Sequence, residues 1–225
     1  MMKEMCLTLT RRGRVLRLLS DLLLGLALGL LAYEALTGAF TWREQGRLRA
    51  VFEHAARADA VEASSASTND WDFAGWASQD AAYWRRLAEG GVFGKIVAPS
   101  AGIDAVVVKG VSREDLKLGP GWVTSTDVPG RTGNTGISGH RTTYLAPFRR
   151  LDELRDGDTI DFYSPYRRYR YRVYRKMAVT PDRVDVMAST VQPQLTLTAC
   201  HPPYSARYRL VVQARLVSVR RLAVR

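Results

Sequence analysis

The hydrophobic pattern of the chain begins with an apolar segment near the N-terminus. Residues 18–40 are mostly leucine, alanine and glycine, and only Asp21 and Glu34 add charge to them. Their length meets the roughly 20 residues that a helix needs to cross the hydrocarbon layer. Glu34 lies far enough along the segment to approach the outer interface, where a carboxylate is less costly than in hydrocarbon. We therefore predict an uncleaved transmembrane signal-anchor over residues 18–40.

A cleaved signal peptide is the alternative for this segment, because its continuous apolar core over residues 22–33 has signal-peptide length. The small-residue matches at 35–37 and 37–39 are only partial cleavage sites, so the anchor is favoured. Residues 1–17 form a basic tail, with one lysine and four arginines against one glutamate. Positive charge before a span stays in the cytoplasm, which predicts a single-pass type II protein of the cell membrane with its remainder outside.

Residues 41–90 are expected to form an extracellular stalk and linker. Over 41–63 an alanine-rich helical pattern has a thin apolar face, typical of a solvated stalk, at Leu48, Val51, Phe52 and Ala55. Residues 64–70 form a low-complexity linker. Five aromatic residues within 71–87 favour a short helix docked on the following domain over contact with the membrane. A further hypothesis is that residues 64–90 cover a functional groove.

From residue 91 to residue 225 the hydrophobic period changes to two, which is typical of half-buried β-strands. Short helices are expected at 112–116, where Ser112 precedes acidic residues, and at 148–156. About eight strands and little helix predict an all-β domain, built as a single closed or nearly closed barrel. The strand candidates behind this prediction are 92–97, 103–108, 134–138, 159–163, 168–175, 195–200 and 206–212.

The formal charge of +11 and a pI near 10.0 invite a nucleic-acid interpretation. The basic residues are scattered, however, and no nucleic-acid-binding motif is among them. Over residues 168–175 arginines alternate with apolar and aromatic side chains, which is typical of an exposed strand face that discourages edge pairing. Anionic lipid head groups or an anionic cell wall explain the charge more simply, and we expect no nucleic-acid partner.

Cys200 ends a strand in which apolar and polar side chains alternate over residues 195–200, so its thiol points away from the leucines. After a turn with two prolines, Arg207 and Arg209 share the outer face of the next strand. A cation beside a cysteine stabilises the thiolate, and a guanidinium steadies a developing oxyanion. Cys6 precedes the membrane segment, so a disulfide is not expected and Cys200 is a candidate reactive thiol.

Two motifs resemble those of a known family. Thr-Leu-Thr-Ala-Cys over 196–200, with Arg209 nine residues after the cysteine, and the Gly-His pair at 139–140 are similar to the signature of sortases. Sortases are cysteine transpeptidases that attach proteins to Gram-positive cell walls. The Cys-His-Pro run that begins at Cys200 is most similar to class E sortases of actinobacteria. The resemblance covers about residues 91–219 and implies an eight-stranded sortase-like barrel with short helices.

Acyl transfer needs a nucleophile, a proton carrier and an oxyanion partner. The candidates are Cys200, His140 and Arg209, in that order, and Thr198 is a candidate substrate contact. The resemblance implies attack on the Thr-Gly bond of a C-terminal sorting signal, Leu-Ala-x-Thr-Gly more often than Leu-Pro-x-Thr-Gly. The implied partners are surface proteins with that signal and an amine of a lipid II-like cell-wall precursor. We expect no cofactor and no metal, since no cysteine or histidine pair has zinc spacing.

Four further residues bear on this assignment. Arg207 is the rival of Arg209, and the family's spacing decides for Arg209. His201 is adjacent to the thiol but points the other way on an extended strand, so a structural role is favoured, and His54 is interpreted as a solvated side chain. Ala199 stands where the family box usually has threonine, and because it lies on the expected core face we interpret it as a packing variation.

Two other classes of function stay open at the level of sequence. A cysteine peptidase would use the same thiol and histidine and let water resolve the acyl-enzyme. A non-catalytic, membrane-tethered domain that binds wall polymer explains the basic surface but leaves the combination of Cys200, His140 and Arg209 unexplained. A pilin-polymerising sortase is disfavoured, because residues 211–225 carry too many arginines for the second membrane helix expected there.

Overall fold

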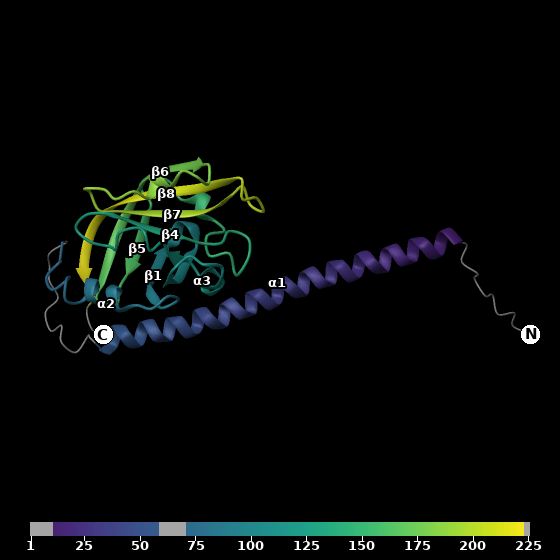
Figure 1. Ribbon diagram of the computed structural model, residues 1–225, viewed down its shortest axis with the longest axis horizontal. Coiled ribbons are helices and arrows are strands. Elements are labelled where there is room, and N and C mark those ends of the chain that lie inside the picture. The colour runs from purple at the N-terminus through teal and green to yellow at the C-terminus, as the bar shows by residue number, and fades with distance from the viewer. Residues whose placement is uncertain (1–10, 59–70, 223–225) are drawn as a thin grey trace, which may run out of the picture.

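The computed structural model describes residues 11–58 and 71–222, with side chains over 13–57 and 71–222. Residues 1–10 of the expected basic tail and the expected linker over 64–70 lie outside the described residues. One long helix, α1 (Arg11–Ala58), passes along one side of a β-domain and projects beyond it (Figure 1). The β-domain and its docked N-terminal segment make up the rest of the described chain.

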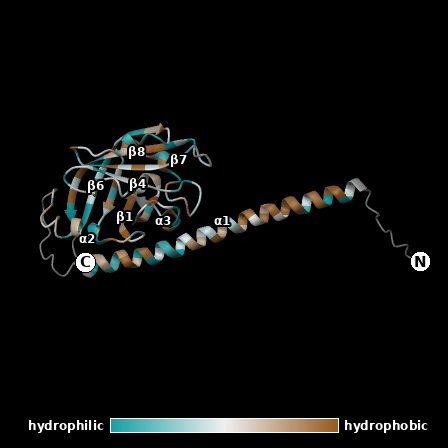
Figure 2. Cartoon of the chain, viewed as in Figure 1, coloured by the Kyte–Doolittle hydropathy of each residue, from teal (hydrophilic) through white to brown (hydrophobic). Residues whose placement is uncertain are grey.

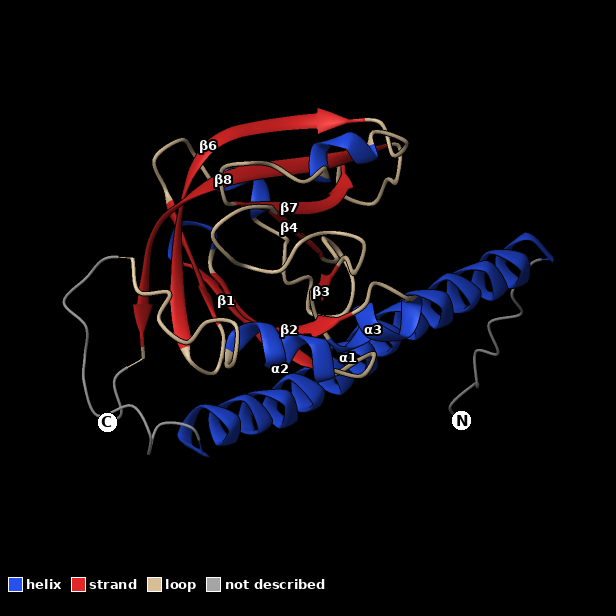
Figure 3. Ribbon diagram, turned by 60° about the vertical axis from the view of Figure 1, so that its left-hand side comes forward, coloured by secondary structure: helices blue, strands red, loops and turns tan. Residues whose placement is uncertain are grey.

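Eight strands close into one barrel, in the order β1-β2-β3-β4-β7-β8-β6-β5 (Figure 3). Two neighbouring pairs are parallel, β2 with β3 and β4 with β7, and the other six are antiparallel. The expected eight-stranded all-β barrel is therefore confirmed. The strands are β1 (Val92–Ala98), β2 (Ile103–Lys109), β3 (Gly121–Trp122), β4 (Asn134–Ser138), β5 (Thr159–Tyr163), β6 (Arg167–Val179), β7 (Gln194–His201) and β8 (Tyr208–Arg221).

Short helices join the strands, and one of them is shorter than expected. The helical stretch expected over residues 148–156 is only a 3₁₀ turn, because Phe148, Leu151 and Leu154 are fully buried and their spacing of three suits a tight turn against the core. The helix expected after Ser112 is confirmed as α3. The short helices are α2 (Asp80–Arg86), α3 (Arg113–Leu118) and the 3₁₀ turns η2 (Pro99–Ala101), η3 (Leu151–Glu153) and η4 (Val184–Met187).

The aromatic segment before the barrel is part of the core. Trp84 of α2 is 2% exposed, and its indole Nε1 donates a hydrogen bond of 2.8 Å to the carbonyl of Phe93. Phe93 in turn stacks on Trp122, with ring centroids 4.6 Å apart. The prediction that residues 71–87 dock a short helix on the domain is therefore confirmed. The aromatic rings drive this docking because they bury a large apolar area against the barrel.

This docked segment lies far from Cys200. Trp71 pairs with Val219 near the end of β8, and the Asp72 backbone N–H donates to the Val219 carbonyl at 2.9 Å. Cys200 pairs with Arg209 near the start of the same strand. The step of ten residues from Arg209 to Val219 corresponds to a strand path of roughly 30 Å. Trp71 and Asp72 therefore do not cover the thiol, and residues 64–70 of the hypothesis lie outside the described residues.

Residues 41–52 of α1 pack against the barrel. The Gln45 side-chain oxygen accepts from the Val106 N–H at 2.8 Å, and its amide donates to the carbonyls of Val106 at 3.0 Å and Leu118 at 2.8 Å. Phe52 is 7% exposed and packs against Val92 and Val106. The expected solvated stalk is therefore wrong for this stretch. Its apolar face is thin because the polar Gln45 supplies much of the contact.

The other part of α1 is the candidate membrane span. Among residues 11–58 and 71–222, α1 is the one helix that is long and apolar enough to cross a membrane. Figure 2 shows hydrophobic residues concentrated where the helix projects and a mixed surface where it runs along the barrel. The segment expected to span, 18–40, and the docked stretch 41–52 thus form one continuous helix. This continuity brings the barrel close to the end of the candidate span.

We expect Gln45→Ala to lower the free energy of unfolding by about 1–3 kcal/mol, because the change leaves backbone groups of Val106 and Leu118 without their hydrogen bonds. Urea unfolding of the full chain in detergent micelles, followed by tryptophan fluorescence, measures the change. Arg47→Ala is the matched control on the same helix, since the Arg47 side chain is 77% exposed. Equal losses in the two variants would contradict the docking of α1.

Candidate active site

Strand pairing brings Cys200 and Arg209 together. In the antiparallel ladder of β7 and β8, Cys200 lies directly opposite Arg209. Directly opposed residues project their side chains from the same face of a sheet. Cys200 is half-buried and forms no disulfide. The thiol and the guanidinium therefore emerge side by side at one end of the barrel, as the alternating pattern predicts.

His140 reaches the same end of the barrel from the neighbouring strand. The parallel ladder of β4 and β7 ends with Ser138 paired to Thr198, and the Gly139 N–H donates to the Thr198 carbonyl at 3.0 Å. His140 follows Ser138 by two residues, and Cys200 follows Thr198 by two residues. Because parallel neighbours advance together, His140, just past the end of β4, lies at the level of Cys200, which is still paired with Arg209 in the sheet.

Gly139 has a steric role in this placement. A Cβ atom at that position would lie 2.7 Å from the ring of Phe148, closer than side-chain atoms approach one another. The Phe148 N–H also donates to the His140 carbonyl at 3.0 Å, and this hydrogen bond fixes the backbone on the C-terminal side of the histidine. Glycine before His140 is therefore required because the buried Phe148 ring fills the space beneath the turn.

The imidazole of His140 is half-buried beneath a loop that the sequence did not single out. Its ring lies against that of Tyr144, with centroids 5.3 Å apart and planes inclined by 29°. Tyr144 and the next two residues, Leu145 and Ala146, have positive φ angles of 51°, 60° and 43°. Such a run is rare for residues with side chains and marks a loop that its packing holds in place. Burial lowers the pKa of His140 from its usual 6.5 and so favours the neutral imidazole.

The lowered pKa of His140 predicts a loss of stability in acid. In the unfolded chain this histidine binds a proton at a higher pH than in the folded protein, so the free energy of unfolding falls as the pH drops below 6.5. We expect this fall to be shallower in His140→Gln, with urea unfolding at stepped pH as the measurement. His54→Gln, at an exposed position of α1, is the control and should keep the wild-type slope. An unchanged slope in His140→Gln would refute the burial effect.

Arg207, the rival of Arg209, lies in a different environment from that of Arg209. Arg207 precedes β8, which begins at Tyr208, and its guanidinium lies 5.3 Å from the centroid of the Tyr208 ring. The expectation that it shares a strand face with Arg209 is wrong, because the turn extends further than the alternation predicts. The Arg209 guanidinium donates to the carbonyls of Ala206 at 3.1 Å and Tyr208 at 3.2 Å, which ties it to this turn.

His201 is held by residues that sequence reasoning missed. Its Nδ1 lies 2.7 Å from a guanidinium nitrogen of Arg141, the residue after His140. Arg141 also forms an ion pair with Asp152 at 2.7 Å and is almost fully buried. This contact fits the structural role expected of His201. The Gly-His-Arg run contains Arg141, but only the fold brings it to His201.

A groove runs from this end of the barrel between η4 and the strands. Its volume is about 610 Å³, and Thr198 and Arg209 both line it. Its other walls are largely apolar and include Val184, Met187 and Val211. An extended chain of small and apolar residues that lies in the groove would therefore reach the Arg209 side chain, next to Cys200.

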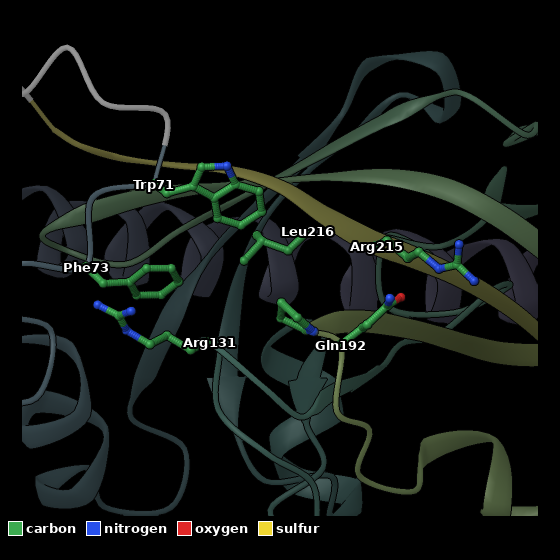
Figure 4. Close-up of a pocket in the computed structure, with 7 residues that line it drawn as sticks. Trp71, Phe73, Arg131, Gln192, Arg215 and Leu216 are labelled. Atoms are coloured by element: carbon green, nitrogen blue, oxygen red, sulfur yellow. The ribbon is translucent and has the colours of Figure 1, made fainter.

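A second cavity, of about 630 Å³, lies at the other end of β7. Trp71, Phe73 and Leu216 form its apolar wall, with Arg131 beside Phe73 (Figure 4). Arg215, which also lines it, pairs with Gln194 at the start of β7. This cavity is therefore a product of the docked aromatic segment and is separate from the groove that Thr198 and Arg209 line, in which Cys200 and His140 are not lining residues.

Comparison with known proteins gives a consistent family. A family model described as the sortase domain matches residues 96–217, more than half of the chain. Sortase SrtE1 of Streptomyces coelicolor is 30% identical over 99 residues, which cover 40% of this chain and 28% of that protein. Sortase SrtE2 of the same organism is 30% identical over 166 residues, which cover 66% of this chain and 65% of that protein. The chain thus spans less than two thirds of the length of either relative.

A solved structure shares the fold. Sortase E1 of Streptomyces coelicolor, solved with a tripeptide in its active site, superposes with a TM-score of 0.56 at 25% identity. The match covers 59% of this chain and 91% of that one. Since α1 makes up much of the remainder, the likeness is that of the barrel.

Proposed function

Because the chain belongs to the sortase family, we propose that it is a membrane-anchored cysteine transpeptidase that acts on C-terminal sorting signals. The observation that carries the proposal is the strand pairing at the end of β7. Cys200 lies opposite Arg209, and His140 leaves the neighbouring strand at the same level. This arrangement supports the assignment of nucleophile, oxyanion partner and proton carrier to these three residues.

In the first half-reaction, the Cys200 sulfur attacks the threonine carbonyl of the Thr-Gly bond while neutral His140 takes the thiol proton. The Arg209 guanidinium donates hydrogen bonds to the oxyanion that forms. The carbon–nitrogen bond then breaks, and His140 gives its proton to the leaving glycine amine. The protein substrate is left as a thioester on Cys200, and the fragment that begins with glycine departs.

In the second half-reaction, an amine of a lipid II-like cell-wall precursor attacks the thioester carbonyl. His140 takes a proton from that amine, the carbon–sulfur bond breaks and the proton returns to the sulfur. The product is an amide between the surface protein and the wall precursor. Water in place of the amine gives hydrolysis, so the ratio of transfer to hydrolysis separates a transpeptidase from a cysteine peptidase.

The groove beside Cys200 is the proposed binding site for the sorting signal. Its apolar walls, with Val184, Met187 and Val211, suit the leucine and the alanine or proline that open the motif. Thr198 lines the same groove and is a candidate contact for the peptide. Similarity to the class E sortases favours Leu-Ala-x-Thr-Gly over Leu-Pro-x-Thr-Gly as the motif.

The α1 helix supports an anchored protein with its barrel outside the cell. Arg14 and Arg17 precede the apolar segment, and positive charge on that side of a span stays in the cytoplasm. The barrel follows the span, so a type II orientation exposes it at the outer surface. The proposed partners, surface proteins and a wall precursor, are both available there.

The full chain in detergent micelles tests this proposal and keeps α1 in place. Fluorescence-quenched peptides with Leu-Ala-x-Thr-Gly or Leu-Pro-x-Thr-Gly are incubated with triglycine as the amine. We expect cleavage between threonine and glycine and a ligated product whose yield rises with the triglycine concentration. Hydrolysed peptide alone at every triglycine concentration would favour the cysteine peptidase. No cleavage of either peptide by folded protein would favour the non-catalytic binding domain.

A further inference from the structure

A buried arginine connects the two backbone segments that carry the candidate catalytic pair. The Arg141 side chain is 2% exposed and has three partners, two of them in the segment 149–152 and the third at the end of β7. One guanidinium nitrogen lies 2.7 Å from His201 Nδ1, another lies 2.7 Å from a carboxylate oxygen of Asp152 in η3, and Nε donates to the Arg149 carbonyl at 3.3 Å. Arg141 is the residue after His140, and His201 is the residue after Cys200. The Arg141–His201 contact therefore joins the two residues that directly follow the candidate catalytic pair.

The chemistry of the two side chains fixes the direction of the Arg141–His201 hydrogen bond. A guanidinium has only donors and keeps its proton in proteins, so His201 Nδ1 is the acceptor. A neutral His201 that accepts at Nδ1 carries its proton at Nε2. Asp152 balances the buried positive charge, which would otherwise be costly. The contact therefore defines both a geometry and a tautomer.

The strand ladders hold residue 200, which pairs with Arg209, but they do not extend to residue 140. The pairing of β4 with β7 ends at Ser138 and Thr198, two residues before the candidate catalytic residues. Beyond that pair, the Gly139 N–H still bonds to the Thr198 carbonyl, and the Arg141–His201 contact lies further out. Arg141 thus joins the segment that follows β4 to the end of β7, just where His140 leaves the sheet.

We propose that Arg141 is a positioning residue, which clamps the His140 segment to the end of β7 and so sets the approach of His140 to Cys200. The inference rests on the proposed acyl transfer, because it concerns the geometry of that reaction. Arg141 has no role as a proton carrier in it. Since a displacement of about 1 Å in a reacting pair costs up to about 100-fold in rate, the clamp controls turnover more than peptide binding.

The kinetic test compares variants of Arg141 and His201 in the full chain in micelles. Arg141→Met should lower kcat by about 10- to 100-fold and leave KM for the peptide within about twofold. His201→Leu should act in the same way because it removes the acceptor. His201→Asn should keep most of the activity, since the asparagine side-chain oxygen stands near the position of Nδ1. Arg150→Met, at an exposed arginine of the same loop, should match the wild type.

Two kinetic results would overturn the clamp. One is an Arg141→Met variant that turns over peptide like Arg150→Met. The other is equal activity in His201→Leu and His201→Asn, because only the asparagine preserves the acceptor. The melting temperature of each variant is measured as well, to check that the variant is folded at the assay temperature. If Arg141→Met does not fold, the comparison of His201→Leu with His201→Asn tests the clamp instead. Substitutions at His201 are less disruptive to folding because this side chain is only half-buried.

A spectroscopic test is independent of peptide turnover. The chain has three histidines, so nitrogen-15 spectra of histidine-labelled protein contain few signals to assign. We expect His201 to show an unprotonated Nδ1 and a protonated Nε2, and Arg141→Met to change both this tautomer and the His140 signals. A rapidly averaging His201 in the wild type would overturn the clamp. A wild type that does not turn over peptide but shows the expected tautomer would refute the proposed function and leave the Arg141 contact established.

Discussion

Cys200→Ser should abolish the acyl-enzyme and lower kcat/KM for sorting-signal peptides by at least about 10³-fold. The expected loss is large because every step of the proposed reaction passes through a sulfur–carbon bond at this residue. A serine hydroxyl in its place is a far weaker nucleophile, and a half-buried histidine with a lowered pKa does not ionise it well. Peptide cleavage followed by chromatography measures the loss.

Cys6→Ser is the matched control, since Cys6 and Cys200 are the two cysteines of the chain and Cys6 precedes the apolar segment. It should retain wild-type turnover. Peptide cleavage that survives in Cys200→Ser at more than a few per cent of the wild-type rate would show that another group is the nucleophile. A shared loss in both cysteine variants would point to a folding effect instead.

Arg209→Met should lower kcat for peptide cleavage by about 10²- to 10³-fold, because the oxyanion loses the only guanidinium that strand pairing sets opposite Cys200. Arg209→Lys keeps the positive charge but loses the planar fork of donors, so we expect it to recover only part of the rate. Stopped-time assays at saturating peptide measure kcat, and a second series below KM separates binding from chemistry.

Arg207→Met is the control for Arg209→Met. Arg207 lies in the turn before β8, where its guanidinium stacks on Tyr208, so its removal should cost little of the turnover. The reverse order, with Arg207→Met inactive and Arg209→Met active, would assign the oxyanion partner to Arg207. That outcome would require the turn to rearrange when the peptide binds.

The barrel and the placement of Cys200 follow from the sequence because both depend on a period of two. Alternation over residues 195–200 puts the thiol on the outer face, and the same logic applied to the next strand turns Arg209 outward. Local pattern is sufficient there, since the side-chain direction of a strand repeats every second residue. The structure adds the register, in which Arg209 and not Arg207 stands opposite Cys200.

The contacts of Gln45 and Arg141 could not be predicted in the same way. Arg141 is buried and Gln45 half-buried, because partners distant in sequence satisfy their hydrogen bonds. The hydrophobic pattern treats such residues as solvent-facing, so the stretch around Gln45 resembled a solvated stalk. Tyr144 was missed for a related reason, because its position over His140 depends on a loop with unusual φ angles.

The most direct test of Cys200 as the nucleophile is the intact mass of the full chain after brief mixing with a Leu-Ala-x-Thr-Gly peptide in the absence of amine. A thioester mechanism predicts an added mass equal to the peptide up to its threonine, located on Cys200 by fragmentation and removed by hydroxylamine. The same adduct should disappear faster when triglycine is present. Peptide cleavage with no adduct on Cys200 at any time, in protein shown to be folded, would contradict a thioester mechanism.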